Sequence, residues 1–152
     1  MTLPASGAPA PEFTLPSTSG QPVSLASLRG RNVLLAFFPA VFTRVCDVEL
    51  CSFRDDFSDF TAADAIVVPI STDTTERQQE FKQAERLPME LLSDSDGRVS
   101  RQYGVYEEKR NRSRRAYVLI DRDGTVRWSH VEEHGGFRRE NAELLAEIAK
   151  LS

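Results

Sequence analysis

The pattern of apolar and polar positions predicts two buried strands in the first half of the chain. Residues 32–38 (NVLLAFF) and 65–70 (AIVVPI) are short, almost continuous apolar runs, which are typical of strands covered on both faces. Pro39 ends the first run, and Pro69 weakens the second because proline cannot donate a backbone hydrogen bond to a sheet. We therefore expect a central sheet covered by helices.

Hairpins and helices are predicted around these strands. Turn residues predict two hairpins: SGQP at 19–22 joins residues 12–15 to 23–25, and Asp123-Gly124 joins residues 116–120 to 125–130. Helices are predicted over residues 43–60, from a capping box at 73–76 to Glu85, and over residues 138–151. A short strand at residues 91–92 and one helical turn at 99–103 complete the set.

The order of these elements predicts an α/β fold. It consists of a mixed central β-sheet flanked by helices, with a β-hairpin at the N-terminus. This arrangement is compatible with a thioredoxin-like fold. A fold alone does not assign a function, so the function has to be argued from the residues that carry chemistry.

Length and composition narrow the class of protein. We expect residues 1–152 to form one domain, with 40% apolar and 28% charged residues, which is ordinary for a soluble globular protein. The net charge of -4 does not favour nucleic acid or an anionic membrane as a partner. No apolar run approaches the roughly 18 residues of a membrane span, and the first residues do not resemble a secretory signal. We expect a cytoplasmic protein.

The two cysteines, Cys46 and Cys51, lie in the predicted helix at 43–60. On a helical wheel Cys51 is rotated by about 140° from Cys46 and lies among polar residues. Cys46 shares an apolar face with Leu50, Phe53, Phe57 and Phe60. The two Cα atoms would be about 8–9 Å apart, whereas a disulfide tolerates at most roughly 7 Å. A disulfide therefore requires that the first turns of the helix unwind.

The spacing of Cys46 and Cys51 does not favour a metal site or a dithiol oxidoreductase motif. Two cysteines at this spacing, with His130 and His134 far away in sequence, do not provide the four ligands of structural zinc, so we expect no metal and no cofactor. The C-x₄-C spacing also differs from the C-x-x-C of dithiol oxidoreductases. Considered alone, the pair fits two unrelated cysteines as well as it fits a redox role.

The position of Cys46 favours a redox role over that of an unrelated cysteine. It lies near the N-terminus of the predicted helix, where unpaired N–H groups and the positive end of the helix dipole stabilise a thiolate. Thr43, three residues earlier, is able to place a hydroxyl beside the sulfur, and it also suits an ordinary N-cap. These two roles of Thr43 are compatible.

Residues 39–46 (PAVFTRVC) fit the pattern P-x-x-x-T-x-x-C and so resemble the signature of the peroxiredoxins. The C-x₄-C spacing is similar to that of the PrxQ subfamily, also called bacterioferritin comigratory protein. Weaker matches occur in order along the chain, at GAPAPEFTL near its start and at residues 70–73, 92–94, 103–105 and 115–121. The departures, Arg44, Asp47 and Pro69, remove no catalytic group.

The resemblance implies a thiol-dependent peroxidase that reduces hydrogen peroxide and organic hydroperoxides. It implies that Cys46 attacks the peroxide and becomes a sulfenic acid, while Thr43 hydrogen-bonds the sulfur and a peroxide oxygen. Backbone amides near Val45 and Cys46 complete the donor set, and Pro39 shields the site from water. Cys51 then forms an intramolecular disulfide with Cys46, which thioredoxin reduces.

The resemblance also assigns the cation of the site. Residues 109–115 contain five basic side chains, which are most simply a solvated loop; nucleic-acid binding by this loop is not expected. Arg115 is selected because it lies six residues before Asp121, as in the family, and Glu49 is implied to orient it. Strand alternation also allows only one of Arg114 and Arg115 to point inward.

Two alternative functions remain open. In the first, Cys46 is the only catalytic cysteine and an external thiol resolves its sulfenic acid. In the second, the chain is a non-catalytic redox-sensing module on the same scaffold. We expect a monomer or weak dimer, because the sequence lacks the C-terminal extension in which some dimeric relatives carry a resolving cysteine.

Overall fold

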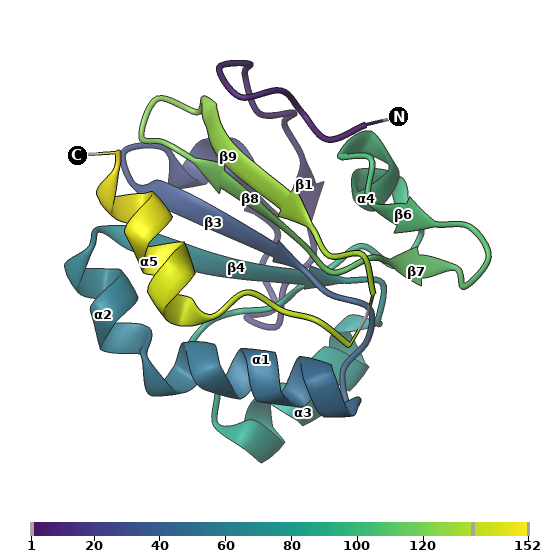
Figure 1. The fold of residues 1–152 in the computed structure, drawn as a ribbon. Coiled ribbons are helices and arrows are strands. Elements are labelled where there is room, and N and C mark those ends of the chain that lie inside the picture. The colour runs from purple at the N-terminus through teal and green to yellow at the C-terminus, as the bar shows by residue number, and fades with distance from the viewer. Residues whose placement is uncertain (1, 135, 152) are drawn as a thin grey trace.

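The fold is described from a computed structural model, which covers residues 2–134 and 136–151. Within these residues the central sheet has five strands in the order β5-β4-β3-β8-β9 (Figure 1). Their bounds are Asn32–Phe37 for β3, Ala65–Ser71 for β4, Leu92–Ser93 for β5, Ala116–Ile120 for β8 and Val126–Val131 for β9. Strand β3 pairs in parallel with β4 and antiparallel with β8, so the sheet is mixed, as predicted.

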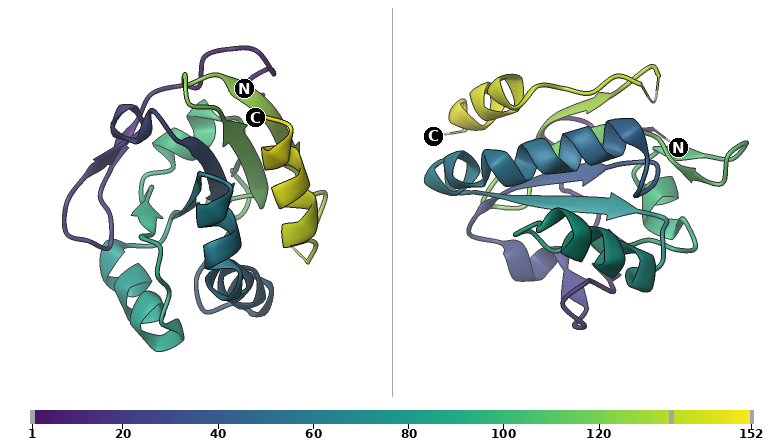
Figure 2. Two further views of the ribbon diagram at one scale, coloured as in Figure 1. Left: turned by 90° about the vertical axis from the view of Figure 1, so that its left-hand side faces the viewer. Right: turned by 90° about the horizontal axis from the view of Figure 1, so that it is seen from below.

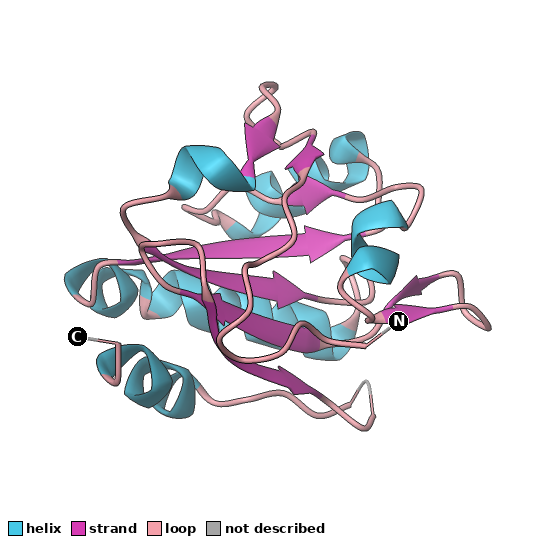
Figure 3. Ribbon diagram, turned by 90° about the horizontal axis from the view of Figure 1, so that it is seen from above, coloured by secondary structure: helices cyan, strands magenta, loops and turns pink. Residues whose placement is uncertain are grey.

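Helices cover both faces of this sheet (Figures 2 and 3). One face packs against α1 (Arg44–Asp55), α2 (Phe57–Ala62), α3 (Thr75–Glu85) and α5 (Asn141–Ala149). The other face packs against the 3₁₀ helix η1 (Leu25–Leu28), α4 (Arg98–Gln102) and the predicted N-terminal hairpin of β1 (Thr14–Leu15) and β2 (Val23–Ser24). Along β3, Leu34 and Ala36 face the first cluster, and Val33, Leu35 and Phe37 face the second. This alternation explains the continuous apolar run.

Pro69 lies inside β4 without interrupting its pairing with β3. The backbone N–H of Phe38 donates to Ile70 O at 2.9 Å, so the polar backbone groups of Ile70 face β3. Backbone groups of successive residues in a strand point to opposite sides, and those of Pro69 therefore face away from β3. On that side β5 pairs only with Ile70 and Ser71. The missing N–H of Pro69 thus removes no hydrogen bond between β3 and β4.

The predicted helix at residues 43–60 is interrupted. Asp56 has φ -104° and ψ 18° and separates α1 from α2. The side chain of Asn141 donates to Ser52 O at 3.0 Å and to Asp56 Oδ2 at 2.8 Å, which satisfies groups at the end of α1. The helical wheel was wrong for Phe57, which is 37% exposed, because α2 does not continue the register of α1.

Other predicted boundaries also shift. The capping box at 73–76 is wrong by one residue: Thr74 is the N-cap of α3, and its hydroxyl accepts an N–H from Arg77 at 3.3 Å. The last helix begins at Asn141 rather than at residue 138. The basic run at 109–115 is not a simple loop, because β6 (Tyr106–Glu107) and β7 (Arg112–Ser113) form a hairpin there.

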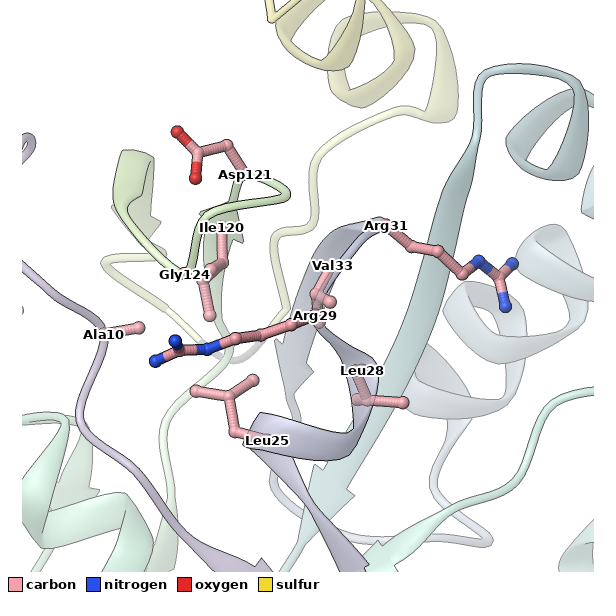
Figure 4. A pocket seen from close by; sticks show the side chains of 9 residues that line it. All are labelled: Ala10, Leu25, Leu28, Arg29, Arg31, Val33, Ile120, Asp121 and Gly124. Atoms are coloured by element: carbon pink, nitrogen blue, oxygen red, sulfur yellow. The ribbon is translucent and has the colours of Figure 1, made fainter.

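A small hollow lies at the end of the sheet where β3 begins (Figure 4). It is lined by Val33, Ile120 and Gly124 among others, and its volume of about 10 Å³ holds about one water molecule. The side chain of Arg29 extends across it toward Ala10. It lies at the opposite end of β3 from residues 39–46 and takes no part in the site described below. Among the described residues, no helix is long and apolar enough to cross a membrane.

Candidate active site

Cys46 lies in the first turn of α1, directly after the loop that follows β3. Helix α1 begins at Arg44, and its N-cap is Thr43, whose carbonyl accepts an N–H from Asp47 at 2.8 Å. The amides of Arg44, Val45 and Cys46 precede that bond, so they have no partner within the helix. The Cys46 side chain is only 1% exposed and packs in the apolar cluster beneath α1. The inward orientation predicted from the helical wheel is confirmed.

Arg115 brings a positive charge to the sulfur. Its Nη2 donates to Cys46 Sγ at 3.0 Å, and its Nη1 donates to Glu49 Oε1 at 2.7 Å. Arg115 immediately precedes β8 and is 2% exposed, whereas its neighbour Arg114 is exposed, so only one of the two points inward, as predicted. Burial lowers the pKa of Arg115, but Glu49 and Cys46 raise it above its usual value. The guanidinium therefore places a fixed positive charge in hydrogen-bond contact with the sulfur of Cys46.

Glu49 lies one turn after Cys46 and is 1% exposed. Arg115 donates to one of its oxygens, and the hydroxyl of Tyr117 donates to the other. Burial raises the pKa of the Glu49 carboxyl, and its interactions with Arg115 and Tyr117 oppose that increase. Because both oxygens accept a hydrogen bond from a donor, the geometry suits an ionised carboxylate.

Thr43 and Pro39 belong to the loop that precedes α1. The hydroxyl of Thr43 donates to Ala40 O at 2.9 Å, not to the sulfur as the resemblance implied. Its single hydrogen is therefore used, and its oxygen lone pairs are the part of the hydroxyl that a ligand is able to meet. Pro39 is buried where β3 leads into the loop. Together with Arg115 it lines a largely polar cavity of about 180 Å³.

Two features of this loop were not predicted. Phe42 adopts the left-handed region with φ 59°, which is unusual for a residue with a side chain, and its ring lies 5.2 Å from that of Phe81. Asp73, which the capping box had assigned to a helix start, instead accepts hydrogen bonds from Val41 N at 2.9 Å and from Ser71 Oγ at 2.7 Å. The carboxylate of Asp73 therefore fastens the loop to the end of β4.

Cys51 lies on the opposite side of α1 and contacts α3. Both cysteines are free thiols within the continuous helix α1. The thiol of Cys51 donates to Glu85 Oε2 at 3.4 Å, and Arg54 Nη1 donates to Glu85 O at 2.6 Å. Burial and the hydrogen bond to Glu85 raise the pKa of Cys51 from 9.0 to about 11. In this state Cys51 is a protonated, weakly nucleophilic thiol.

We predict that Glu85→Gln makes Cys51 more reactive. The experiment uses a Cys46→Ser background, so that Cys51 is the only thiol. Removing the negative charge lowers the pKa of Cys51, so the thiolate fraction at pH 8 and the rate of alkylation by iodoacetamide should rise about tenfold. Glu80→Gln, which removes an exposed carboxylate from the same helix, is the control and should leave the rate unchanged. An unchanged rate in Glu85→Gln would contradict the role of Glu85.

Sequence reasoning did not identify Tyr117, Asp73, Glu132 and Arg139, which support the site. Tyr117 carried a detectable signal, because it lies two residues after Arg115 on the same side of a strand. Glu132 is buried and accepts from Arg139 Nε at 2.8 Å, and its own N–H donates to Arg115 O at 2.9 Å. No local pattern marks that pair. Within the described residues, no group of three or more His, Cys, Asp or Glu side chains is placed to hold a metal ion.

A buried cysteine at a helix N-terminus, in contact with a buried arginine, is the environment in which reactive cysteines are found. The sequence profile of the AhpC/TSA family matches residues 6–129, and the chain therefore belongs to this family. Peroxiredoxin Bcp of Escherichia coli K12 is 37% identical over 123 residues, which cover 77% of this chain and 79% of that protein. A relative from Coxiella burnetii, also named as a Bcp peroxiredoxin, is 41% identical over 138 residues, 85% of this chain and 91% of that protein.

Solved structures agree with this assignment. The crystal structure of peroxidoxin BcpB from Mycobacterium tuberculosis matches with a TM-score of 0.88 and 31% identity, over 97% of each chain. AhpC of Enterococcus faecalis, at 20% identity, has a TM-score of 0.90 over 99% of this chain and 92% of that chain, which shows the fold alone. The predicted thioredoxin-like fold and the resemblance to the Bcp and Q peroxiredoxins are confirmed. Peroxiredoxins are thiol-dependent peroxidases, oxidoreductases that consume a peroxide and a thiol reductant.

Proposed function

We propose that Cys46 is the residue that attacks the peroxide. The observation that carries this proposal is the guanidinium of Arg115, 3.0 Å from the buried Cys46 sulfur. The thiolate attacks one oxygen of R–O–O–H, so that an S–O bond forms and the O–O bond breaks. The departing alkoxide takes a proton and leaves as an alcohol, or as water when the substrate is hydrogen peroxide. Cys46 is oxidised to a sulfenic acid.

The surrounding groups stabilise the charge that moves through this step. Arg115 donates to the sulfur, and the amides of Val45 and Cys46, which have no partner within the helix, are the further donors that we assign to the sulfur and to the oxygens beside it. Thr43 accepts a hydrogen bond from the protonated peroxide oxygen through its free lone pairs, since its own hydrogen goes to Ala40 O. Pro39 presents no N–H and keeps water from the thiolate. These donors and the acceptor orient the O–O bond for attack.

Cys51 completes the cycle by attacking the sulfenic sulfur. An S–S bond forms, and the hydroxyl of the sulfenic acid leaves as water. The start of α1 must unwind for the two sulfurs to meet, and Cys51 must separate from Glu85. Because the pKa of Cys51 is about 11 beside Glu85 and near 9.0 when released, ionisation above pH 9 favours the opened state, so disulfide formation should accelerate as the pH rises.

The reductant that we propose is a thioredoxin-type dithiol. The opened α1 exposes the disulfide to such a partner, which the folded helix would not. We further propose that the protein works as a cytoplasmic monomer or weak dimer on hydrogen peroxide and organic hydroperoxides. The alternatives are a peroxidase in which an external thiol resolves Cys46, and a redox sensor that reacts with peroxide no faster than free cysteine.

Stopped-flow kinetics and mass spectrometry distinguish these functions. We expect wild-type protein to react with hydrogen peroxide at least about 1,000-fold faster than free cysteine, because the thiolate and its donors are prearranged. After one equivalent of peroxide, an intact monomer should have lost two mass units. A stable sulfenic adduct in wild type would indicate an external resolving thiol. A rate equal to that of free cysteine would contradict the peroxidase function.

A further inference from the structure

Strand β8 presents a polar side chain to the site, that of Tyr117. Arg115 lies two residues earlier, immediately before β8, and both side chains reach Glu49 on the face of the sheet that carries Cys46. Tyr117 is fully buried, and its hydroxyl donates to Glu49 and accepts the backbone N–H of Arg139 at 3.0 Å. The chemistry proposed above uses Arg115, which contacts Glu49, but assigns no role to Tyr117.

The hydroxyl of Tyr117 is a fixed donor. Burial and the neighbouring Glu49 carboxylate raise the pKa of Tyr117, so the phenol keeps its proton. A phenol has one hydrogen to donate, and this hydrogen points to Glu49. The N–H of Arg139 occupies the acceptor side of the same oxygen and so fixes the direction of the O–H bond.

Glu49 depends on this donor because it is fully enclosed. Burial raises the pKa of Glu49, and the charge of Arg115 and the hydrogen bond from Tyr117 lower it. Arg138, in the segment before α5, adds a weaker positive influence. If Glu49 became protonated, it would lose its charge attraction to Arg115, and the guanidinium would no longer be held beside the sulfur of Cys46.

These hydrogen bonds form part of a closed ring that begins and ends at Arg115. The guanidinium of Arg115 and the hydroxyl of Tyr117 both donate to Glu49, and the Tyr117 hydroxyl accepts the backbone N–H of Arg139. The side chain of Arg139 donates to Glu132 at 2.8 and 3.2 Å, and the N–H of Glu132 returns to Arg115 O at 2.9 Å. Arg115 is therefore held at both its side chain and its backbone, and Tyr117 is the link between the two halves.

We propose that Tyr117 is a positioning residue for the peroxidase reaction: its hydroxyl orients the Glu49 carboxylate so that Glu49 holds Arg115 against Cys46 Sγ. Tyr117 does not contact the reacting atoms and acts through Glu49 and Arg115. This inference rests on the proposed function of Cys46.

The test compares wild type with Tyr117→Phe, which keeps the ring and removes the hydroxyl. Loss of the donor raises the pKa of Glu49 further, so Glu49 takes up a proton at a higher pH than in wild type. We measure the pH profile of the second-order rate constant for hydrogen peroxide, and we call the pH range over which this constant falls on acidification its acid limb. The midpoint of the acid limb should move upward by about one pH unit in Tyr117→Phe. Below the wild-type midpoint the rate constant of the variant should be about tenfold lower than that of wild type, and well above it the two should be nearly equal.

Tyr103→Phe is the matched control. Tyr103 is also fully buried, and its hydroxyl donates to Pro11 O at 2.6 Å on the opposite face of the sheet. It should lower the melting temperature without moving the acid limb. The inference is overturned if Tyr117→Phe keeps the wild-type limb, or if both tyrosine variants move it equally.

Two further measurements separate this inference from the proposed function. Alkylation of Cys46 by iodoacetamide in a Cys51→Ser background needs no peroxidase activity, and its acid limb should also move upward in Tyr117→Phe. If the peroxide rate of wild type were that of free cysteine, the proposed function would fail, and alkylation would still test Tyr117. In a Glu49→Gln background, where position 49 cannot titrate, Tyr117→Phe should produce no shift; a shift there would count against the role of Glu49 as intermediary.

Discussion

Replacing Cys46 with serine should abolish peroxide reduction. We expect Cys46→Ser to lower the rate constant for hydrogen peroxide by at least about 1,000-fold, because a serine hydroxyl is not ionised near neutral pH and cannot form a sulfenic acid. The substitution is nearly isosteric, and Arg115 and Glu49 keep their contact with each other. The loss should therefore appear in the reaction rate and not in the folded structure, which circular dichroism can check.

Cys51→Ser is the matched control, since it removes the other thiol of the same helix. It should react with the first equivalent of peroxide as fast as wild type, but it should form no intramolecular disulfide. With excess peroxide and no added thiol, its Cys46 should proceed to the sulfinic acid, seen as a gain of 32 mass units. The assignment of Cys46 would be refuted by full peroxidase activity in Cys46→Ser.

The second large effect is expected from Arg115. In Arg115→Met the peroxide rate should fall about 100- to 1,000-fold, the usual loss when a preorganised donor is removed from a developing charge. The variant also leaves Glu49 buried without its cation, which costs about 3–5 kcal/mol of folding free energy when one partner of a buried ion pair is removed. Stopped-flow kinetics and urea unfolding measure the two effects separately.

Arg114→Met provides the comparison for this variant. Arg114 is the preceding residue, is exposed, and donates to Glu132 O at 3.1 Å. Its removal should change the peroxide rate less than about twofold and the free energy of unfolding by about 1 kcal/mol. Equal losses of rate in Arg114→Met and Arg115→Met would show that the general positive charge of residues 109–115 matters, and not the contact of Arg115 with the sulfur.

Local periodicity accounts for the parts of the site that could be predicted. The position of Cys46 on the inner face of α1 follows from the helical repeat. The alternation of an extended chain allowed only one of Arg114 and Arg115 to point inward, and the spacing of Arg115 from Asp121, as in the family, selected Arg115. Both repeats are properties of the backbone and do not depend on distant residues. The buried strands β3 and β4 were predictable for a related reason, because a sheet covered on both faces needs apolar residues at every position.

The errors occurred where a distant residue decides the local structure. The break between α1 and α2 is stabilised by Asn141, which lies 85 residues after Asp56 in the chain. Asp73 has the sequence pattern of a helix cap but binds the loop at Val41, 32 residues earlier. In each case a polar side chain met a backbone or side-chain partner that no window of sequence contains.

The order of the main strands and helices, the inward face that carries Cys46, and the separation of Cys46 and Cys51 on one helix were all predictable from the sequence. The contacts that hold each thiol in place come from the packing of distant elements. Cys46 meets Arg115, which lies 69 residues later and immediately before strand β8, and Cys51 meets Glu85 from a helix 34 residues later. The reason is physical: repeats of 3.6 and 2 residues orient a side chain within its own element, whereas the charge that it meets depends on how the sheet and its helices pack.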